Sequence, residues 1–199
     1  MLKLYPDAAA VVLARATGLS IEKVDLIEVE RAPDRATAVL NDRTAFDAYV
    51  EYRSSNGDRG FLGIETKYTE PFSDDLGLGE EKRDKYRQLA DSMSVFKTPL
   101  SPDLLSPKAS QLFRNLLLSL VHADDQNVQG HVLVVALDAD RDASAGVRIV
   151  REQLVAPDDH LRSVSIESIV DAAMAQPALA TFAQAFKQRY LDLSPVTNK

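Results

Sequence analysis

The stretch GFLGIETKYTE, residues 60–70, decides the fold, because it has the pattern of a β-strand that carries charge close to its end. Apolar residues fill its first half, and Pro71 limits any continuation of the strand. Glu65 and Lys67 are two residues apart, and alternate side chains of a strand share a face. A carboxylate and an amine therefore lie side by side on one face of this strand.

The segment before it, AFDAYVEYRS at 45–54, predicts a second strand. Between the two lies Ser-Asn-Gly-Asp at 55–58, and Asn-Gly is a strong signal for a tight hairpin turn. The two strands therefore form an antiparallel hairpin. Strand alternation assigns to its core face the side chains of Phe46, Ala48, Val50, Tyr52, Leu62, Ile64 and Thr66.

The polar side chains of the hairpin are expected on its other face. The apolar faces of paired strands must coincide, since this coincidence fixes the register. Asp47 and Glu51 then share a face with Glu65 and Lys67, and Asp47 lies opposite Glu65 or Lys67.

This cluster has a chemical use. Two carboxylates a few ångströms apart repel unless a hard divalent cation lies between them, and oxygen ligands suit Mg²⁺. A neighbouring lysine can orient an attacking water or stabilise charge that develops on a phosphate. The alternative is a solvated hairpin face whose cross-strand ion pairs contribute little to stability.

The remaining segments predict an α/β fold, a mixed central sheet flanked by helices. One domain, residues 1–199, is expected, with 142–199 as a mainly helical C-terminal extension. The predicted helices are 6–17, 78–96, 108–122, 145–155 and 167–191. The other predicted strands are 23–30, 36–40, 131–139 and 161–166.

Composition narrows the function classes. The chain has no cysteine, which excludes disulfides and thiolate metal sites and favours a reducing, cytoplasmic environment. No apolar stretch approaches the ~20 residues that a membrane span needs, so we expect no membrane association. The net charge of −7 argues against a broadly basic nucleic-acid binder. An enzyme that contacts nucleic acid through a local patch and bound cations remains open.

An Asp-bearing strand, a hairpin and Glu-x-Lys on the return strand together resemble the signature of the PD-(D/E)XK nuclease superfamily. Here the signature is Asp47 followed by Glu65-Thr66-Lys67. More narrowly, residues 43–70 resemble bacterial proteins catalogued as candidate restriction endonucleases, whose second motif is similar to GIExKYTE. The resemblance implies a restriction-endonuclease-like core with the element order αβββαβ, which the predicted elements match.

The resemblance implies a metal-dependent nuclease that hydrolyses DNA phosphodiester bonds, with a role in restriction or another defence. Asp47 and Glu65 would be metal ligands, and the backbone carbonyl of Thr66 would complete the coordination. Lys67 would act on the attacking water. The implied cofactor is Mg²⁺, with Mn²⁺ as a substitute, and the implied partner is DNA. Many members of the superfamily form a homodimer to cut both strands.

Two departures from the family pattern bear on activity. Phe46, not proline, precedes Asp47, which the superfamily tolerates. Many members supply a Glu from the first helix, but the segment 8–17 contains no acid. Glu28, Glu30 or Glu51 could substitute, or the chain is a shortened relative without an upstream helix. A catalytically inactive member of the fold, acting as a binding or assembly module, is therefore the alternative function, and an unrelated α/β domain with a charged hairpin is the third.

Two helices carry further candidate residues. Lys82 and Lys85 belong to a basic cluster that could contact substrate phosphates, or that could form a solvated face paired with neighbouring acids. Gln111 and Arg114 lie one helical turn apart on an otherwise apolar helix. In superfamily nucleases a polar residue on such a helix often supports the site, whereas the alternative for Arg114 is a snorkelling side chain at the helix edge.

Overall fold

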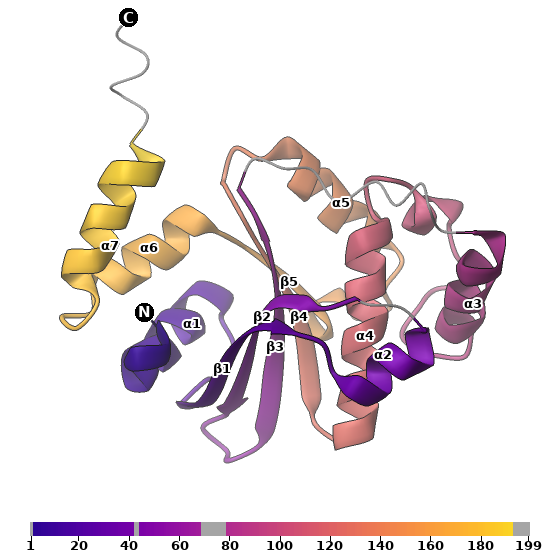
Figure 1. Cartoon of the computed structure of the whole chain (residues 1–199), viewed down its shortest axis with the longest axis horizontal. Helices are drawn as coiled ribbons and strands as arrows, with labels where there is room; N and C mark the ends of the chain where they lie inside the picture. The colour runs from indigo at the N-terminus through magenta and orange to yellow at the C-terminus, as the bar shows by residue number, and fades with distance from the viewer. Residues whose placement is uncertain (1, 42–43, 69–78, 193–199) are drawn as a thin grey trace, which may run out of the picture.

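The computed structural model describes residues 2–41, 44–68 and 79–192 (Figure 1). The strands are β1 (Lys23–Arg31), β2 (Phe46–Arg53), β3 (Arg59–Lys67), β4 (Gln129–Ala136) and β5 (Leu161–Ser165). The α-helices are α1 (Pro6–Thr17), α2 (Asp34–Leu40), α3 (Glu80–Asp91), α4 (Ser110–Gln126), α5 (Arg141–Glu152), α6 (Ile166–Met174) and α7 (Ala180–Phe186). Shorter helical segments are η1 (Leu2–Leu4), η2 (Pro102–Leu105), η3 (Pro157–Asp159) and the π-helical η4 (Lys187–Leu191).

The strands form one mixed sheet in the order β1-β2-β3-β4-β5. The first three strands pair antiparallel, and β3, β4 and β5 pair parallel. The predicted order αβββαβ is present as α1, β1, β2, β3, α4 and β4, with α2 and α3 inserted between these elements. The prediction of a mixed α/β sheet is therefore confirmed. Strand β5 joins this sheet from within the region predicted as a mainly helical extension.

Helices cover both faces of the sheet. Figure 1 shows α4 on one side and α1, α6 and α7 on the other. On the α4 side, Tyr49 and Phe61 belong to a hydrophobic core that includes Leu116. On the α1 side, Val50 and Leu62 belong to a second core. Side chains at the middle of the sheet are therefore buried whichever face they occupy.

The prediction of a strand at 36–40 is wrong, because these residues lie in α2. The side-chain hydroxyl of Thr37 donates to the backbone carbonyl of Pro33, 3.0 Å away, within the first turn. Ala36 and Leu40 are buried one turn apart on the same helix face. The helical spacing of these two apolar residues outweighs the strand propensity of the β-branched residues around them.

The predicted hairpin is confirmed, and its register is the one that coinciding apolar faces require. Val50 pairs with Leu62, and Gly57 adopts a φ of 82° in the connecting turn. The assignment of Phe46 to the same face as Val50 is wrong. Its ring packs against Gly63 and Tyr49, on the α4 side of the sheet. Strand β2 begins at Phe46, so strict alternation does not yet constrain its direction.

Candidate active site

Two neighbouring strands and a covering helix meet at one end of the sheet. Asp47 lies at the start of β2, and Glu65 and Lys67 lie at the end of β3. Since Ala48 pairs with Ile64, the next step along both strands places Asp47 across from Glu65. The first turns of α4 cover the same end, because α4 runs antiparallel to the following strand β4 and begins where β3 ends (Figure 1).

Glu65 and Lys67 form a buried ion pair. Lys67 Nζ lies 2.7 Å from Glu65 Oε1, and the two residues are 5% and 1% exposed. Charged side chains are rarely buried to this extent unless they are paired. The two-residue spacing predicted that they share a face, and the structure adds that α4 removes this face from water.

Two amide side chains of α4 bind the carboxylate of Glu65. Gln111 Nε2 donates to Glu65 Oε1 at 2.6 Å, and Asn115 Nδ2 donates to Glu65 Oε2 at 2.7 Å. Lys67 Nζ donates to Gln111 Oε1 at 3.0 Å. Gln111 thus joins the carboxylate to the ammonium, and Asn115 holds the second carboxylate oxygen. The four side chains form one connected polar network in an apolar surrounding.

Asp47 is held by Thr66, the residue between Glu65 and Lys67 on β3. The backbone N–H of Thr66 and the hydroxyl of Thr66 both donate to Asp47 Oδ2, at 2.7 and 2.9 Å. Neither bond uses Oδ1. Asp47 is half-buried and Thr66 is exposed, so this is the side from which the cluster is open to solvent.

Burial raises the pKa of Glu65 above its ordinary value of 4.5, and the negative charge of Asp47 raises it further. The hydrogen bonds from Lys67 and Asn115 act in the opposite direction and lower the pKa. The charged form of Glu65 is thus under strain that a further positive charge between the two carboxylates would relieve. The electrostatics of the cluster favour a cation.

The donor set fits a hard divalent cation. Asp47 and Glu65 offer carboxylate oxygens, and the backbone of Thr66 between Glu65 and Lys67 offers a carbonyl oxygen. Proteins commonly hold Mg²⁺ through one or two carboxylates, with water and substrate phosphate as the other ligands. Across residues 2–41, 44–68 and 79–192, no group of three or more His, Cys, Asp or Glu side chains could hold a metal. In this part of the chain, Asp47 and Glu65 are thus a pair of candidate acidic ligands without a third such side chain beside them.

The structure does not bring two of the predicted substitute acids, Glu51 and Glu28, to this cluster. Glu51 accepts a hydrogen bond from Tyr49 at 3.3 Å and lies opposite Phe61, well along the hairpin from Asp47. Glu28 pairs with Arg31 at 3.0 Å. Glu30 is different.

The strand register around Glu30 brackets Asp47, because Val29 pairs with Ala48 and Arg31 pairs with Phe46. Glu30 therefore lies across from Asp47 on β1. It is exposed and has a φ of 53°, a left-handed conformation that non-glycine residues seldom adopt. Its supporting role stays a prediction.

The other predicted residues lie on helices around the cluster. Arg114 is half-buried on α4, between Gln111 and Asn115 in the sequence. Lys82 and Lys85 are half-buried on α3, which packs against α4. Their roles stay predictions. Arg87 of α3 pairs with Asp84 at 2.7 Å. Such a pair is what the alternative for this helix, a solvated face paired with neighbouring acids, predicts.

Sequence reasoning missed Asn115. It selected Gln111 with Arg114, three residues later, although Gln111 and Asn115 at i and i+4 share a helix face equally well. The signal was present, because Asn115 is a polar residue in the middle of the apolar run that α4 buries. A buried amide needs a partner, and the partner here is Glu65.

The fold and the cluster together define a class of protein. A hairpin that places Asp opposite Glu-x-Lys, at the end of a mixed sheet covered by helices, is the arrangement that the resemblance in the sequence implies. A family model described as the PD-(D/E)XK nuclease superfamily matches residues 1–192, and the chain belongs to that superfamily. Membership points to a nuclease, a hydrolase with a nucleic-acid substrate.

Other comparisons add no relative. Neither the search of curated proteins nor the search of solved structures found a match. The last two residues of the GIExKYTE string, 69 and 70, lie outside the described residues. No helix in the described part of the chain is long and apolar enough to cross a membrane.

Proposed function

We propose that this protein is a Mg²⁺-dependent endonuclease that hydrolyses DNA phosphodiester bonds, with a role in restriction or another defence. The observation that carries the proposal is the buried Glu65–Lys67 pair, which two amides of α4 hold beside Asp47. A solvated hairpin face would not need this network, because water satisfies exposed charges and exposed ion pairs contribute little to stability. A buried and fully bonded charge pair costs stability, so its presence favours a functional reason.

Asp47, Glu65 and the carbonyl of Thr66 would hold the Mg²⁺, with Mn²⁺ as a substitute. Bound there, the ion would lower the pKa of a water and offset charge that develops on the phosphate. Thr66 fixes Asp47 through two hydrogen bonds, and Asn115 fixes the second oxygen of Glu65. These contacts preorganise both carboxylates and so reduce the reorganisation needed to form the site.

Lys67 would orient the attacking water and stabilise the phosphate as its charge rises. Its ammonium contacts both Glu65 and Gln111, and these two contacts fix its position before a substrate binds. Gln111 would keep Lys67 beside the carboxylates. Lys82, Lys85 and Arg114 would contact phosphates further along the DNA. A homodimer would supply the second centre needed to cut both strands.

Nicking of supercoiled plasmid tests this proposal. The wild type should nick plasmid with Mg²⁺ or Mn²⁺, and Asp47→Ala, Glu65→Ala and Lys67→Ala should each lose at least about a hundredfold in rate, as expected for groups that act in the transition state. Glu51→Gln is the matched control, since it changes an acid of the same hairpin that lies away from the cluster. Activity that survives all three alanine substitutions would remove this cluster from the mechanism.

The second candidate is a non-catalytic binding or assembly module of the same fold. The absence of an acid in α1 after Asp7 favours it, as does the occupation of both Glu65 oxygens by side chains of the protein. Titration calorimetry with Mn²⁺ separates the two. No heat of binding and no cleavage of DNA or RNA would establish the module, whereas binding that Asp47→Ala abolishes would support the enzyme.

A further inference from the structure

The end of the candidate catalytic strand is tied to the C-terminal helical segment. Tyr68 follows Lys67 directly, and its hydroxyl donates to the backbone carbonyl of Tyr190 at 2.6 Å. Tyr190 lies in η4, which continues α7 on the side of the sheet opposite α4 (Figure 1). Tyr68 directly follows Lys67, so this contact ties η4 to the end of β3, while the Lys67 side chain itself lies beneath α4 on the other face of the sheet.

This contact presents two aromatic rings and a cation to solvent. Tyr68 and Tyr190 are 37% and 41% exposed. The guanidinium carbon of Arg189 lies 5.2 Å from the centre of the Tyr190 ring, in cation–π contact. Arg189 is exposed, and among the described residues it forms no ion pair with an acid. Its charge is therefore available to a ligand that approaches Tyr190.

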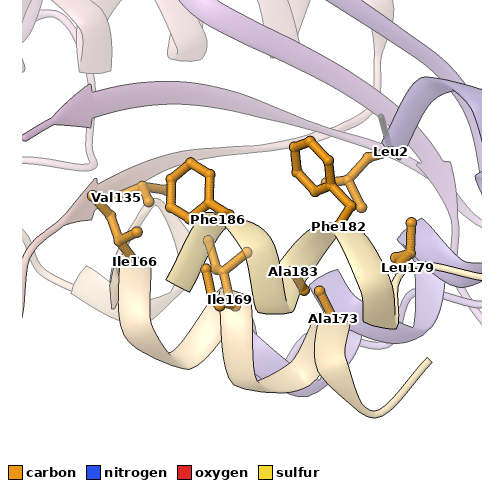
Figure 2. Close-up of a pocket in the computed structure, with 10 residues that line it drawn as sticks. Leu2, Val135, Ile166, Ile169, Ala173, Leu179, Phe182, Ala183 and Phe186 are labelled. Atoms are coloured by element: carbon orange, nitrogen blue, oxygen red, sulfur yellow. The ribbon is translucent and has the colours of Figure 1, made fainter. Parts of the chain in front are cut away.

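The packing of the preceding helix fixes where these rings lie. Phe186 is half-buried, and its ring lies 4.8 Å from that of Tyr190, centre to centre. Figure 2 shows Phe186 pointing into an apolar pocket of about 180 Å³, together with Ile166 and Val135. Phe186 thus anchors the helix and supports the Tyr190 ring from behind.

The apolar pocket itself is a poor site for a nucleobase. It is lined by aliphatic and phenylalanine side chains, such as Ile169 and Phe182. The polar edge of a base would have no hydrogen-bond partner there, and burial of an unpaired polar group is costly. The exposed rings of Tyr68 and Tyr190 differ, because a base stacked on them keeps its edge in water.

We propose that Tyr68, Arg189 and Tyr190 form a stacking subsite for an unpaired nucleobase next to the candidate active site, so the substrate is DNA with a single-stranded segment. This inference rests on the proposed function. Two exposed tyrosines with a neighbouring cation offer the stacking surface and the positive charge that bind single strands, because every base has a π face. The net charge of −7 disfavours the alternative of long electrostatic contact with a duplex.

Fluorescence anisotropy in EDTA, with the full chain, tests the subsite without cleavage. The probes are a fluorescein-labelled single-stranded 20-mer of thymidine, about the length of a few binding sites, and the same strand in a blunt duplex. The wild type should bind the single strand more tightly than the duplex. Tyr190→Ala should weaken single-strand binding by roughly fivefold to a hundredfold, the range measured for the loss of one stacked base.

Matched variants distinguish stacking from a general loss of structure. Tyr190→Phe keeps an aromatic face and should recover the affinity that Tyr190→Ala loses, while Arg189→Ala should weaken the single strand more than the duplex. Tyr5→Ala is the control, because Tyr5 is an exposed aromatic residue away from this contact, 42% exposed. Circular dichroism should show the same fold for every variant.

Equal affinity of the wild type and Tyr190→Ala for the single strand would overturn the subsite, and so would a wild type that binds neither probe. A protein partner, not nucleic acid, would then be the ligand to seek at these rings. The binding result in EDTA does not depend on whether the protein cleaves DNA. A wild type that binds the single strand through Tyr190 but cleaves nothing in Mg²⁺ would refute the proposed function and leave the subsite standing.

Discussion

Glu65 is a carboxylate placed where its charge is disfavoured. Its pKa is raised in the folded protein, chiefly by burial. Just above pH 4.5 the folded state therefore still binds a proton that the unfolded chain has released. Stability then falls as the pH rises through the raised pKa, so the ionised form of Glu65 opposes folding. An uncharged side chain at this position would avoid the cost to stability. A charged residue that lowers stability is typical of functional sites.

The hydrogen bond from Asn115 offsets part of this cost. Asn115→Ala removes the donor to Glu65 Oε2 and leaves a buried oxygen unpaired, so the free energy of unfolding should fall by about 1–3 kcal/mol. Glu65 should also lose its fixed orientation, and the affinity for Mn²⁺ should fall by roughly 10- to 100-fold, as for other residues that orient a metal ligand. Urea denaturation and titration calorimetry measure the two effects.

Ser119→Ala is the control for this prediction. Ser119 is a buried polar residue on α4, and it lies one turn further from Glu65 than Asn115 does. It should leave the Mn²⁺ affinity unchanged. If Asn115→Ala lowers stability but leaves Mn²⁺ affinity at the wild-type value, Asn115 supports the fold and does not position the ligand.

At the scale of elements, strand alternation and one turn signal predict most of the candidate site. The Asn-Gly turn and the coinciding apolar faces place Asp47 across from Glu65, and the two-residue spacing places Lys67 beside Glu65. The burial of this face could not be predicted, because it depends on where α4 packs. Gln111 was selected and contacts both Glu65 and Lys67, whereas Asn115 was missed because the strand beneath a helix face decides which of its polar residues find partners.

Gly63 shows how β2 and β3 fix one another. A Cβ atom at Gly63 would lie 2.4 Å from the ring of Phe46, so the close approach of this ring requires a glycine. Gly63→Ala should lower the free energy of unfolding by about 1–3 kcal/mol through overpacking. It should also reduce plasmid nicking, because Phe46 immediately precedes Asp47. Urea denaturation and the nicking assay measure the two effects.

A double-mutant cycle provides the control. Phe46→Leu replaces the ring with a smaller side chain, so Gly63→Ala should cost much less in this background than in the wild type, with a coupling of about 0.5–3 kcal/mol. Equal costs of Gly63→Ala in both backgrounds would mean that the glycine is needed for a reason other than the Phe46 ring.

At the scale of the whole molecule, helices cover both faces of the sheet, and this covering determines which side chains are buried. The apolar run at 131–139 predicts a buried central strand; β4 ends earlier, at Ala136, and lies between β3 and β5 as that pattern requires. Hydrophobic patterning does not distinguish helix from strand in α2, because the segment is short and carries signals for both. It also gives no warning that His131, at the start of the run, is as buried as its apolar neighbours.

His131 is 1% exposed, and burial lowers its pKa to about 4 from an ordinary 6.5. Between these values the unfolded chain binds a proton that the folded protein does not, so stability present above pH 6.5 is lost as the pH falls toward 4. Since one pKa unit is worth about 1.4 kcal/mol, the loss is on the order of 3 kcal/mol. His131→Gln removes the titrating group, so its unfolding free energy should fall less than that of the wild type between pH 7 and pH 4. Urea denaturation followed by circular dichroism measures both curves, and the other titrating groups, Glu65 included, cancel in their difference. Parallel curves would show that His131 already accepts the proton in the folded state.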